Sequence, residues 1–432
     1  DGLTADGAWV RELRERIERY GGKVQVVASQ DAPCDTLILL GKSEAAEPFL
    51  KDHPVPEREQ GYVMVSAEAA NKRTIVLVGH DRLGLLWAIT SFNQLVHEKD
   101  GICRVRAADV EDYPYAVNRG FIDSYWPEGV PYVIAFKINK PVFQTALYDY
   151  SIANRENRYR SWRTPPSESV KEALRLMGQR FTPLGIEWYA GVNPYHTRWE
   201  HKVIISSEDD YQAVLAKALA AAEAGGNFCL KFDDYHFPLK PEDKERFGTV
   251  KDADVYLLNR LHRDLKARHP DSKLLFCPPF YYGPTSQTPY PESRDEYLFA
   301  LGREVPKDID VFWTGPSVKS GSVTPEMVQW ITERIQRKPV YWQNAIGTSH
   351  MHYYHYVTDP LPVLKDWLYD GFLKDVDAYM LNSGMPGTAT AVASIADFCW
   401  NPAAFDPKRS IAEAAGKLFG PETLPALEEL NE

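Results

Sequence analysis

Two adjacent aspartates, Asp233 and Asp234, are the residues whose type and spacing most clearly indicate chemistry. They follow the apolar run NFCLKF, so we expect both to stand where a buried strand ends. Neighbouring carboxylates disfavour double ionisation, which raises the pKa of one member of the pair. One aspartate can then stay protonated as a general acid while the other stays ionised. A pair that only caps the following loop or helix is the alternative interpretation.

Adjacent acids differ from the usual layout of a glycosidase, in which two carboxylates from different strands flank the sugar. They fit the substrate-assisted variant, in which the 2-acetamido oxygen of an N-acetylhexosamine is the nucleophile and an oxazoline is formed. One aspartate would accept the acetamide N–H as a hydrogen-bond donor. The other would protonate the leaving oxygen and then deprotonate the attacking water.

Short apolar strands alternate with long helical stretches from Val117 onward, a pattern typical of parallel βα units. The helices include Asp209–Ala224, Val255–Arg268 and Pro325–Arg337. We predict an α/β fold with a (β/α)8 TIM barrel, whose catalytic residues lie at the C-terminal ends of the strands. A doubly wound sheet is the runner-up, but it would normally carry a glycine-rich phosphate loop. The eight predicted strands are Val117–Tyr125, Phe143–Tyr150, Gly185–Val192, Asn227–Asp233, Lys273–Tyr281, Asp310–Thr314, Pro339–Asn344 and Asp377–Asn382.

A small α/β N-terminal domain is predicted to precede the barrel. Its expected elements are a helix at Ala5–Tyr20, strands at Asp35–Leu40, Gly61–Val65 and Thr74–Val78, and a helix at Leu83–His97. The polar segment ADVEDYPYAVNRG places the boundary near residue 112. We therefore expect an N-terminal domain over 1–112, a catalytic barrel over 113–405, and the start of a C-terminal helical segment over 406–432.

The amino-acid composition disfavours several classes of partner and of site. Acidic residues number 60 and basic residues 49 among 432, so the net charge is −11 and nucleic acid is an unfavourable partner. No apolar run reaches the ~18 residues that a membrane span needs. The five cysteines are scattered singly, which predicts buried free thiols and neither a disulfide framework nor cysteine-ligated zinc. The compartment, the oligomeric state and the aglycone stay open.

With these residues in view, the chain resembles glycoside hydrolase family 84, the retaining β-N-acetylglucosaminidases that include the protein O-GlcNAcases. The resemblance covers almost the whole chain. FCLKFDD is similar to the family's paired-aspartate strand, and the other segments occur in the family's order. These are LVGHDRLGLLWAITSFNQLV in the N-terminal domain and DYPYAVNRGFIDSYWPEG, GIEWYAGVNP, FCPPFYYG, DVFWTGPSV, VYWQN and LNSGMPGTATAVASIADFCWNP in the barrel.

The resemblance implies a role for each matching residue. Asp233 would orient and polarise the acetamido group, and Asp234 would be the general acid/base. Tyr281 would hydrogen-bond the acetamide oxygen, and Trp342 would wall the acetamide pocket. Asn344 would contact the acetamide and Asn382 the sugar hydroxyls. Core packing for Trp342 and Tyr281, and a turn for Asn382, are the alternatives. Further substrate-binding candidates at strand ends are Asp123, Ser124, Trp313 and His350.

The chain also departs from the family's pattern on the far side of the sugar ring. Asp123-Ser124-Tyr125-Trp126-Pro127 replaces the glycine-rich element after the first strand, and no lysine occurs between Thr145 and Asn157. The family's aspartate for O4 and O6 is Ser349 here, followed by His350. Because a pocket selects sugars through hydrogen bonds to particular hydroxyls, we lean towards N-acetylgalactosamine (GalNAc) over N-acetylglucosamine (GlcNAc).

We therefore predict an exo-acting retaining β-N-acetylhexosaminidase that needs no metal or organic cofactor and acts on a carbohydrate with a terminal β-linked N-acetylhexosamine. One rival is a metal-dependent hydrolase, since histidines and carboxylates at barrel ends can hold zinc. Its ligands would come from Asp233, Asp234, His236, His350, His352 and His355. The other rival is a non-catalytic carbohydrate-binding relative, although both aspartates and the tyrosine are retained.

Overall fold

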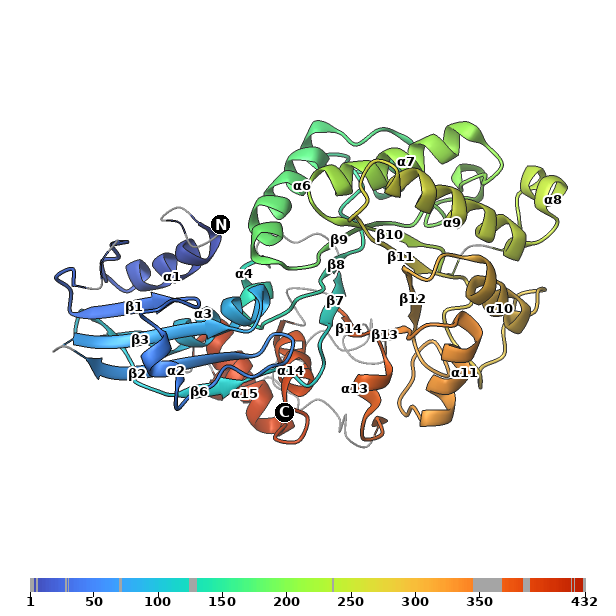
Figure 1. The fold of residues 1–432 in the computed structure, drawn as a ribbon. Coiled ribbons are helices and arrows are strands. Elements are labelled where there is room, and N and C mark those ends of the chain that lie inside the picture. The colour runs from blue at the N-terminus through green and yellow to red at the C-terminus, as the bar shows by residue number, and fades with distance from the viewer. Residues whose placement is uncertain are drawn as a thin grey trace. The chain divides into compact units, whose positions relative to one another are not determined.

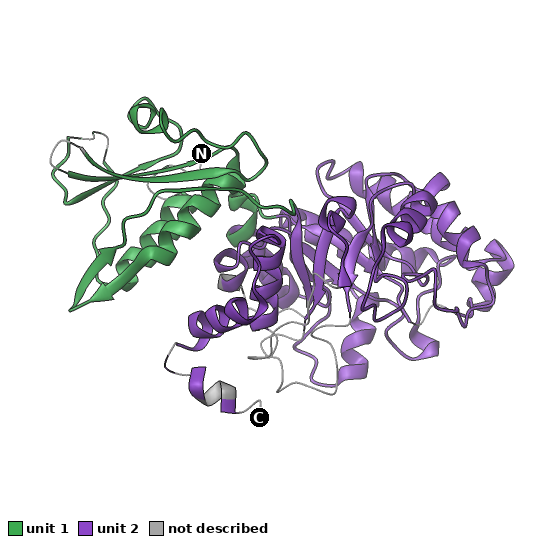
Figure 2. Cartoon of the chain, turned by 90° about the horizontal axis from the view of Figure 1, so that it is seen from below, with its two compact units in different colours: residues 1–117, 180–186 green, residues 118–179, 187–432 purple. Residues whose placement is uncertain are grey.

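The computed structural model describes residues 4, 7–27, 29, 31–69, 72–123, 130–234, 237–344, 367–383, 389–420, 422 and 424–429. The chain forms two compact units, coloured separately in Figure 2. Unit 1 comprises residues 1–117 and 180–186, and unit 2 comprises 118–179 and 187–432. The first break follows Val117, five residues beyond the predicted end of the N-terminal domain, and the last helices belong to the barrel unit.

Unit 1 is a small α/β layer built on a four-stranded sheet with the order β1-β3-β2-β6. β1 pairs with β3 in parallel, and β2 pairs with β3 and β6 in antiparallel register. Valines from β2 and β3 pack against Ala46 in a buried cluster. The elements are α1 (Ala8–Arg19), β1 (Thr36–Leu40), α2 (Glu47–Leu50), β2 (Tyr62–Ala69), β3 (Lys72–Gly79), α3 (Arg82–Leu95), β4 (Val96–Lys99), β5 (Ile102–Val105), β6 (Val110–Asp112) and the 3-10 turn η3 (Thr182–Leu184).

Unit 2 is a closed barrel of parallel strands in the order β7-β8-β9-β10-β11-β12-β13-β14, with helices outside it (Figure 1). The predicted TIM barrel is thereby confirmed. The strands are β7 (Arg119–Asp123), β8 (Val142–Phe143), β9 (Tyr189–Val192), β10 (Asn227–Lys231), β11 (Leu274–Cys277), β12 (Ile309–Trp313), β13 (Val340–Gln343) and β14 (Ala378–Asn382).

Helices follow the strands and cover them, as βα units require. The apolar face predicted for the helix after residue 209 is buried, with Val214, Leu215 and Ala218 against the sheet side. The helices are α4 (Val130–Ala135), α5 (Arg155–Arg160), α6 (Glu168–Phe181), α7 (Glu208–Glu223), α8 (Pro241–Phe247), α9 (Val250–Lys266), α10 (Arg294–Glu304), α11 (Pro325–Ile335), α13 (Phe372–Asp375), α14 (Ala389–Trp400), α15 (Pro407–Phe419) and α16 (Leu424–Glu429), with 3-10 turns η2 (Ser161–Arg163) and η4 (Trp199–His201).

On each strand, every second side chain points into the barrel, and these side chains fill its interior. Cys229, Phe312, Trp342 and Met380 belong to this inner cluster, so residues two positions along the same strands also face inward. Two strands approach closely at Gly191, where a Cβ would lie 2.7 Å from the Cα of Gln144. Glycine at this place therefore brings the segment after β8 against β9.

The opposite, N-terminal face of the barrel holds a buried ion network. The ammonium of Lys140 lies 2.7 Å from Asp377, 2.9 Å from Asp310 and 3.3 Å from Glu187. Lys140 is almost fully buried, so its charge depends on these three carboxylates. This network joins segments that precede or begin four of the strands, and it belongs to the face that stabilises such barrels.

The second predicted strand is wrong in extent. The structure has a two-residue strand, Val142–Phe143, and turns from residue 144 to 147, where the sequence predicted a strand to Tyr150. The fifth strand ends at Cys277, so Tyr281 lies in the loop beyond it. All five cysteines are free thiols, as predicted, but the predicted burial holds for only three of them, because Cys34 is exposed and Cys103 is half-buried. No helix within the described ranges has the length and apolarity to cross a membrane.

Candidate active site

Asp233 and Asp234 stand at the C-terminal end of β10. Asp233 has the same inward parity as Cys229 and Lys231, since it lies four and two positions beyond them. Strict alternation would turn Asp234 away from the barrel. Asp234, however, has a left-handed backbone with φ 69°, which breaks the alternation. Aspartate tolerates that region better than most residues, at a cost of ~1–3 kcal/mol.

Asp233 is held from two sides. The side-chain amide of Asn193, just after β9, donates to its Oδ1 at 3.1 Å. The ammonium of Lys231 lies 3.5 Å from its Oδ2. Asn193 is itself fixed, because its Oδ1 accepts the Tyr195 backbone N–H at 2.9 Å and Tyr148 bonds its backbone. The Asp233 carboxylate therefore has a hydrogen-bond donor at one oxygen and a cation near the other.

Asp234 has a different environment. Burial, and then the charge of Asp233, raise the pKa of Asp234 above its usual value. The hydroxyl of Tyr281 donates to its Oδ1 at 2.6 Å, which opposes part of that rise. Tyr281 is anchored through its backbone carbonyl, which accepts the Thr314 N–H at 2.8 Å. The two carboxyl groups thus have different surroundings, and the pKa of Asp234 is raised by its own.

An aromatic wall adjoins the pair. Trp342 on β13 is buried, and its ring lies 6.0 Å from that of Tyr281, centre to centre. The Trp342 indole N–H is buried without a hydrogen-bond partner among the described residues. Asn344 and Asn382 lie two positions after Trp342 and Met380, so they also face the inside of the barrel. The side-chain amide of Asn382 donates to Oδ1 of Asn344 at 2.5 Å. The structure therefore brings Tyr281, Trp342, Asn344 and Asn382 to the end of the barrel that holds the aspartates.

Of the remaining predicted site residues, the structure describes only the side chain of Trp313, and it does not join this group. Trp313 is fully buried, donates its indole N–H to the Gly283 carbonyl at 3.0 Å, and packs edge-on against Tyr341. Its neighbour Phe312 is the one that faces the barrel interior, so the expected substrate contact of Trp313 is corrected to a packing role. The side chain of Asp123, and the whole of Ser124 and His350, lie outside the described residues.

Three residues at the site were not predicted from the sequence: Asn193, Lys231 and Gln144. The signal for Lys231 was its spacing, because a lysine two positions before Asp233 in a buried strand must share its face. Asn193 stood at a predicted strand end, in GVNP, without an assigned role. Gln144 was hidden by the wrong extent of the second strand.

Metal ligation has no support among the described residues, where no group of three or more His, Cys, Asp or Glu side chains is arranged to hold an ion. His236, His350, His352 and His355, which the metal-dependent alternative needs, lie outside them. That alternative is therefore left to experiment.

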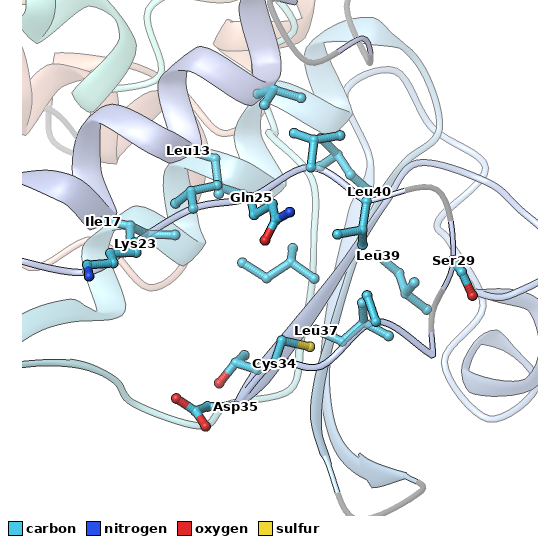
Figure 3. A pocket seen from close by; sticks show the side chains of 18 of the residues that line it. Leu13, Ile17, Lys23, Gln25, Ser29, Cys34, Asp35, Leu37, Leu39 and Leu40 are labelled. Atoms are coloured by element: carbon cyan, nitrogen blue, oxygen red, sulfur yellow. The ribbon is translucent and has the colours of Figure 1, made fainter.

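A separate cavity of about 1260 Å³ lies in unit 1 (Figure 3). It is lined by α1, by the segment that follows it, and by β1, through aliphatic side chains such as Leu13 and Leu37 together with polar ones such as Lys23, Gln25 and Asp35. It shares no residue with the aspartate site. Its lining lacks the paired acids that the barrel end provides, so the barrel is the better candidate for catalysis.

Comparisons with known proteins agree with this choice. The profile of a family described as beta-N-acetylglucosaminidase matches residues 141–432, which include the aspartate pair. Curated proteins named Protein O-GlcNAcase, from Rattus norvegicus and from Mus musculus, are each 34% identical to this chain over 125 residues. Each match covers 29% of this chain and 13% of the relative, so only a small part of those proteins is matched.

Solved structures share the fold. A mutant of the Thermobaculum terrenum O-GlcNAc hydrolase has a TM-score of 0.60 and 22% identity, over 73% of this chain and 66% of its own. A structure titled CpGH84B has a TM-score of 0.69 and 17% identity, over 96% and 70%. A third, CpGH84D, has a TM-score of 0.69 and 20% identity, over 100% and 69%.

Proposed function

This chain belongs to the beta-N-acetylglucosaminidase family, glycoside hydrolase family 84, and from that membership we propose that it is an exo-acting retaining β-N-acetylhexosaminidase. Its substrate is a carbohydrate with a terminal β-linked N-acetylhexosamine. The observation that supports this most directly is the unequal environment of the two aspartates. Asn193 and Lys231 contact Asp233, whereas burial raises the pKa of Asp234.

In the proposed reaction, the acetamide carbonyl oxygen of the substrate attacks C1 while the bond from C1 to the leaving oxygen breaks. Asp234 gives its proton to that leaving oxygen. Asp233 accepts the acetamide N–H, which increases the electron density on the attacking oxygen. Water then attacks C1 of the oxazoline while the bond from C1 to the acetamide oxygen breaks, which restores the acetamide, and the water gives a proton to Asp234. The configuration at C1 is therefore retained after two inversions.

The surrounding residues have roles in the same proposal. Tyr281, already bonded to Asp234, is close enough to the pair to meet the acetamide oxygen as well. Trp342 offers its buried ring to the acetamide methyl, and its indole N–H, which has no partner among the described residues, offers a donor. Asn344 and Asn382 present amides at the same rim. Asp123, Ser124 and His350 remain proposed sugar contacts on sequence grounds.

The identity of the sugar is the finest part of the proposal. The family's description names GlcNAc. In this chain Ser349, followed by His350, stands where the family has the aspartate that binds O4 and O6, and this replacement favours GalNAc. We keep the GalNAc preference as a prediction. Its structural basis would lie in residues 345–366, which are not among those described.

Initial rates on para-nitrophenyl β-GlcNAc and β-GalNAc, each with and without EDTA, test the proposal. We expect hydrolysis that EDTA leaves unchanged, with release of the β-anomer as the first product. Faster hydrolysis of the GalNAc substrate would support the rebuilt O4 grip, and faster hydrolysis of the GlcNAc substrate would contradict it. Activity abolished by EDTA would favour a metal-dependent hydrolase. A protein that binds the sugars without turnover would be a non-catalytic relative.

A further inference from the structure

Lys231 is the most unusual residue of the barrel interior. It ends β10 with only 5% of its surface exposed, and its neighbours on the inner face are apolar side chains and thiols. A lysine is almost never buried in this way unless it is paired. A structural role alone would be served better by an aliphatic residue of similar length. The cost of burying the ammonium therefore calls for a reason.

The partners of Lys231 connect it to the catalytic pair. Its ammonium lies 3.5 Å from Oδ2 of Asp233, donates to Oε1 of Gln144 at 2.5 Å, and sits 4.6 Å from the centre of the Trp342 ring. The close approach at Gly191 is what brings Gln144 to this place. The ammonium thus contacts the carboxylate, an amide and the aromatic wall of the site.

Burial by itself would lower the pKa of Lys231, but Asp233 and the other nearby groups more than reverse this, so the pKa is raised and the lysine stays charged. The other titratable groups facing the pair within the described residues are largely neutral near pH 7. Burial raises the pKa of Cys229 to about 12, raises that of Cys277 well above its usual value, and lowers that of His196. The remaining ones are the phenols of Tyr148, Tyr281, Tyr282 and Tyr290, whose pKa values are all raised by burial.

We propose that Lys231 is a positioning residue that confines the single negative charge of the aspartate pair to Asp233 and so leaves the proton on Asp234. This inference rests on the proposed function, because only that reaction needs the two aspartates in these two states. Adjacent carboxylates can share one proton in two arrangements, and only one of them is productive. A cation beside one carboxylate but further from the other removes this ambiguity.

The test compares Lys231→Met with Gln144→Leu, each against the wild type. Removal of a cation this close should raise the pKa of the nearby carboxylate by about one unit or more. We therefore expect the acidic limb of the kcat/KM profile to move up by about one pH unit in Lys231→Met, with a lower maximum. Gln144→Leu removes the amide partner but keeps the cation, so its acidic limb should stay in place.

Outcomes against the inference are distinct. An acidic limb in Lys231→Met that superposes on that of the wild type overturns it and leaves the proposed function intact. An equal shift in Gln144→Leu also overturns it, because the effect would then come from packing. If Lys231→Met does not fold, as judged by circular dichroism and thermal unfolding, Lys231→Gln is the second neutral variant.

A readout without catalysis separates the two hypotheses. Carbon-13 titration of the aspartate carboxyl groups, with Asp233→Asn to identify the signal, follows the charge of Asp233 directly. A wild type without hexosaminidase activity would overturn the proposed function. The titration would still test Lys231, since an unchanged midpoint of Asp233 in Lys231→Met overturns the inference and an upward shift of about one unit supports it.

Discussion

At the scale of single residues, the site depends on two aspartates of the same chemical type having different surroundings. The left-handed backbone of Asp234 turns it out of the strand's alternation, where burial raises its pKa. Asp233 keeps the strand's inward direction and meets Asn193 and Lys231. The difference in surroundings between these neighbours therefore follows from backbone geometry as much as from charge.

Substitution of each aspartate should separate the two roles. In Asp234→Asn, turnover of substrates with poor leaving groups should fall by about a hundredfold or more, because the proton donor is lost. Activated aryl glycosides need little protonation and should lose far less. Asp233→Asn should slow both, because the acetamide loses its acceptor. Steady-state rates on both substrate types measure this, and equal losses for the two types in Asp234→Asn would contradict the assignment.

The hydroxyl of Tyr281 should set the alkaline limit of activity. In the proposed mechanism Asp234 must be protonated to act, so the rate should fall as the pH rises through its raised pKa. The Tyr281 hydrogen bond stabilises the ionised form, and Tyr281→Phe should therefore raise that pKa and move the alkaline limb to higher pH. The maximal rate should drop by ~100-fold because a donor to the developing charge is lost. An alkaline limb at lower pH would refute this role, with Tyr282→Phe as the matched control.

The sequence predicted the residues that carry recognisable chemistry and missed those that act through contact. Asp233, Asp234, Tyr281, Trp342, Asn344 and Asn382 all lie at the predicted end of the barrel. Trp313 was predicted to face the site, but its neighbour Phe312 faces the barrel interior instead. In a continuous run of apolar and aromatic residues, the sequence does not show which residues point inward. The contact between Lys231 and Gln144 joins positions 87 residues apart, which no local pattern can indicate.

At the scale of elements, the order of all eight strands was predictable while their lengths were not. A run of apolar residues indicates a buried strand, but it does not show at which residue the hydrogen-bonded pairing with the neighbouring strands ends. β8 keeps only Val142 and Phe143 in register with β7 and β9, and the chain then turns. The predicted strand continued to Tyr150 because residues 146–148 are apolar as well, although they are buried by packing outside any strand.

The ion network around Lys140 should be a main stabilising element of the barrel's N-terminal face. Lys140→Met would leave three carboxylates together, so the free energy of unfolding should fall by about 3 kcal/mol near pH 7. Lys273→Met is the control, since Lys273 pairs with Glu187 while half exposed and should cost less than ~1 kcal/mol. Urea unfolding measures both, and similar losses in the two variants would contradict the prediction.

The stabilisation by Lys140 should also depend on pH in a defined direction. The pKa of Glu187 is lowered in the folded state: burial opposes this, but Lys140 and Lys273 outweigh it. A carboxylate of this kind contributes stability above its unfolded pKa and loses it as the pH falls through its folded pKa. The difference between wild type and Lys140→Met should therefore shrink below about pH 4. A difference that grows in acid would contradict this assignment.

At the scale of the whole molecule, the two compact units are interleaved in sequence. Residues 180–186 belong to unit 1, although the chain on both sides of them belongs to the barrel unit. Within unit 1, η3 contacts α1 and α3, and the Arg180 guanidinium donates to Glu12 at 2.9 Å. The predicted boundary near residue 112 could not include this excursion, because a boundary drawn from composition is a single cut.

A barrel freed of residues 1–117 should consequently be less stable than the full chain. Leu184 is fully buried in η3, and its exposure alone would remove about 1.5–3 kcal/mol. Arg180 would also lose Glu12. We expect residues 118–432 to unfold at a lower temperature and to self-associate through the uncovered η3, as measured by thermal unfolding and size-exclusion chromatography. Leu184→Ser in the shortened chain should reduce the association without restoring the stability. A shortened chain as stable as the full one would show that residues 180–186 depend on the barrel rather than on unit 1.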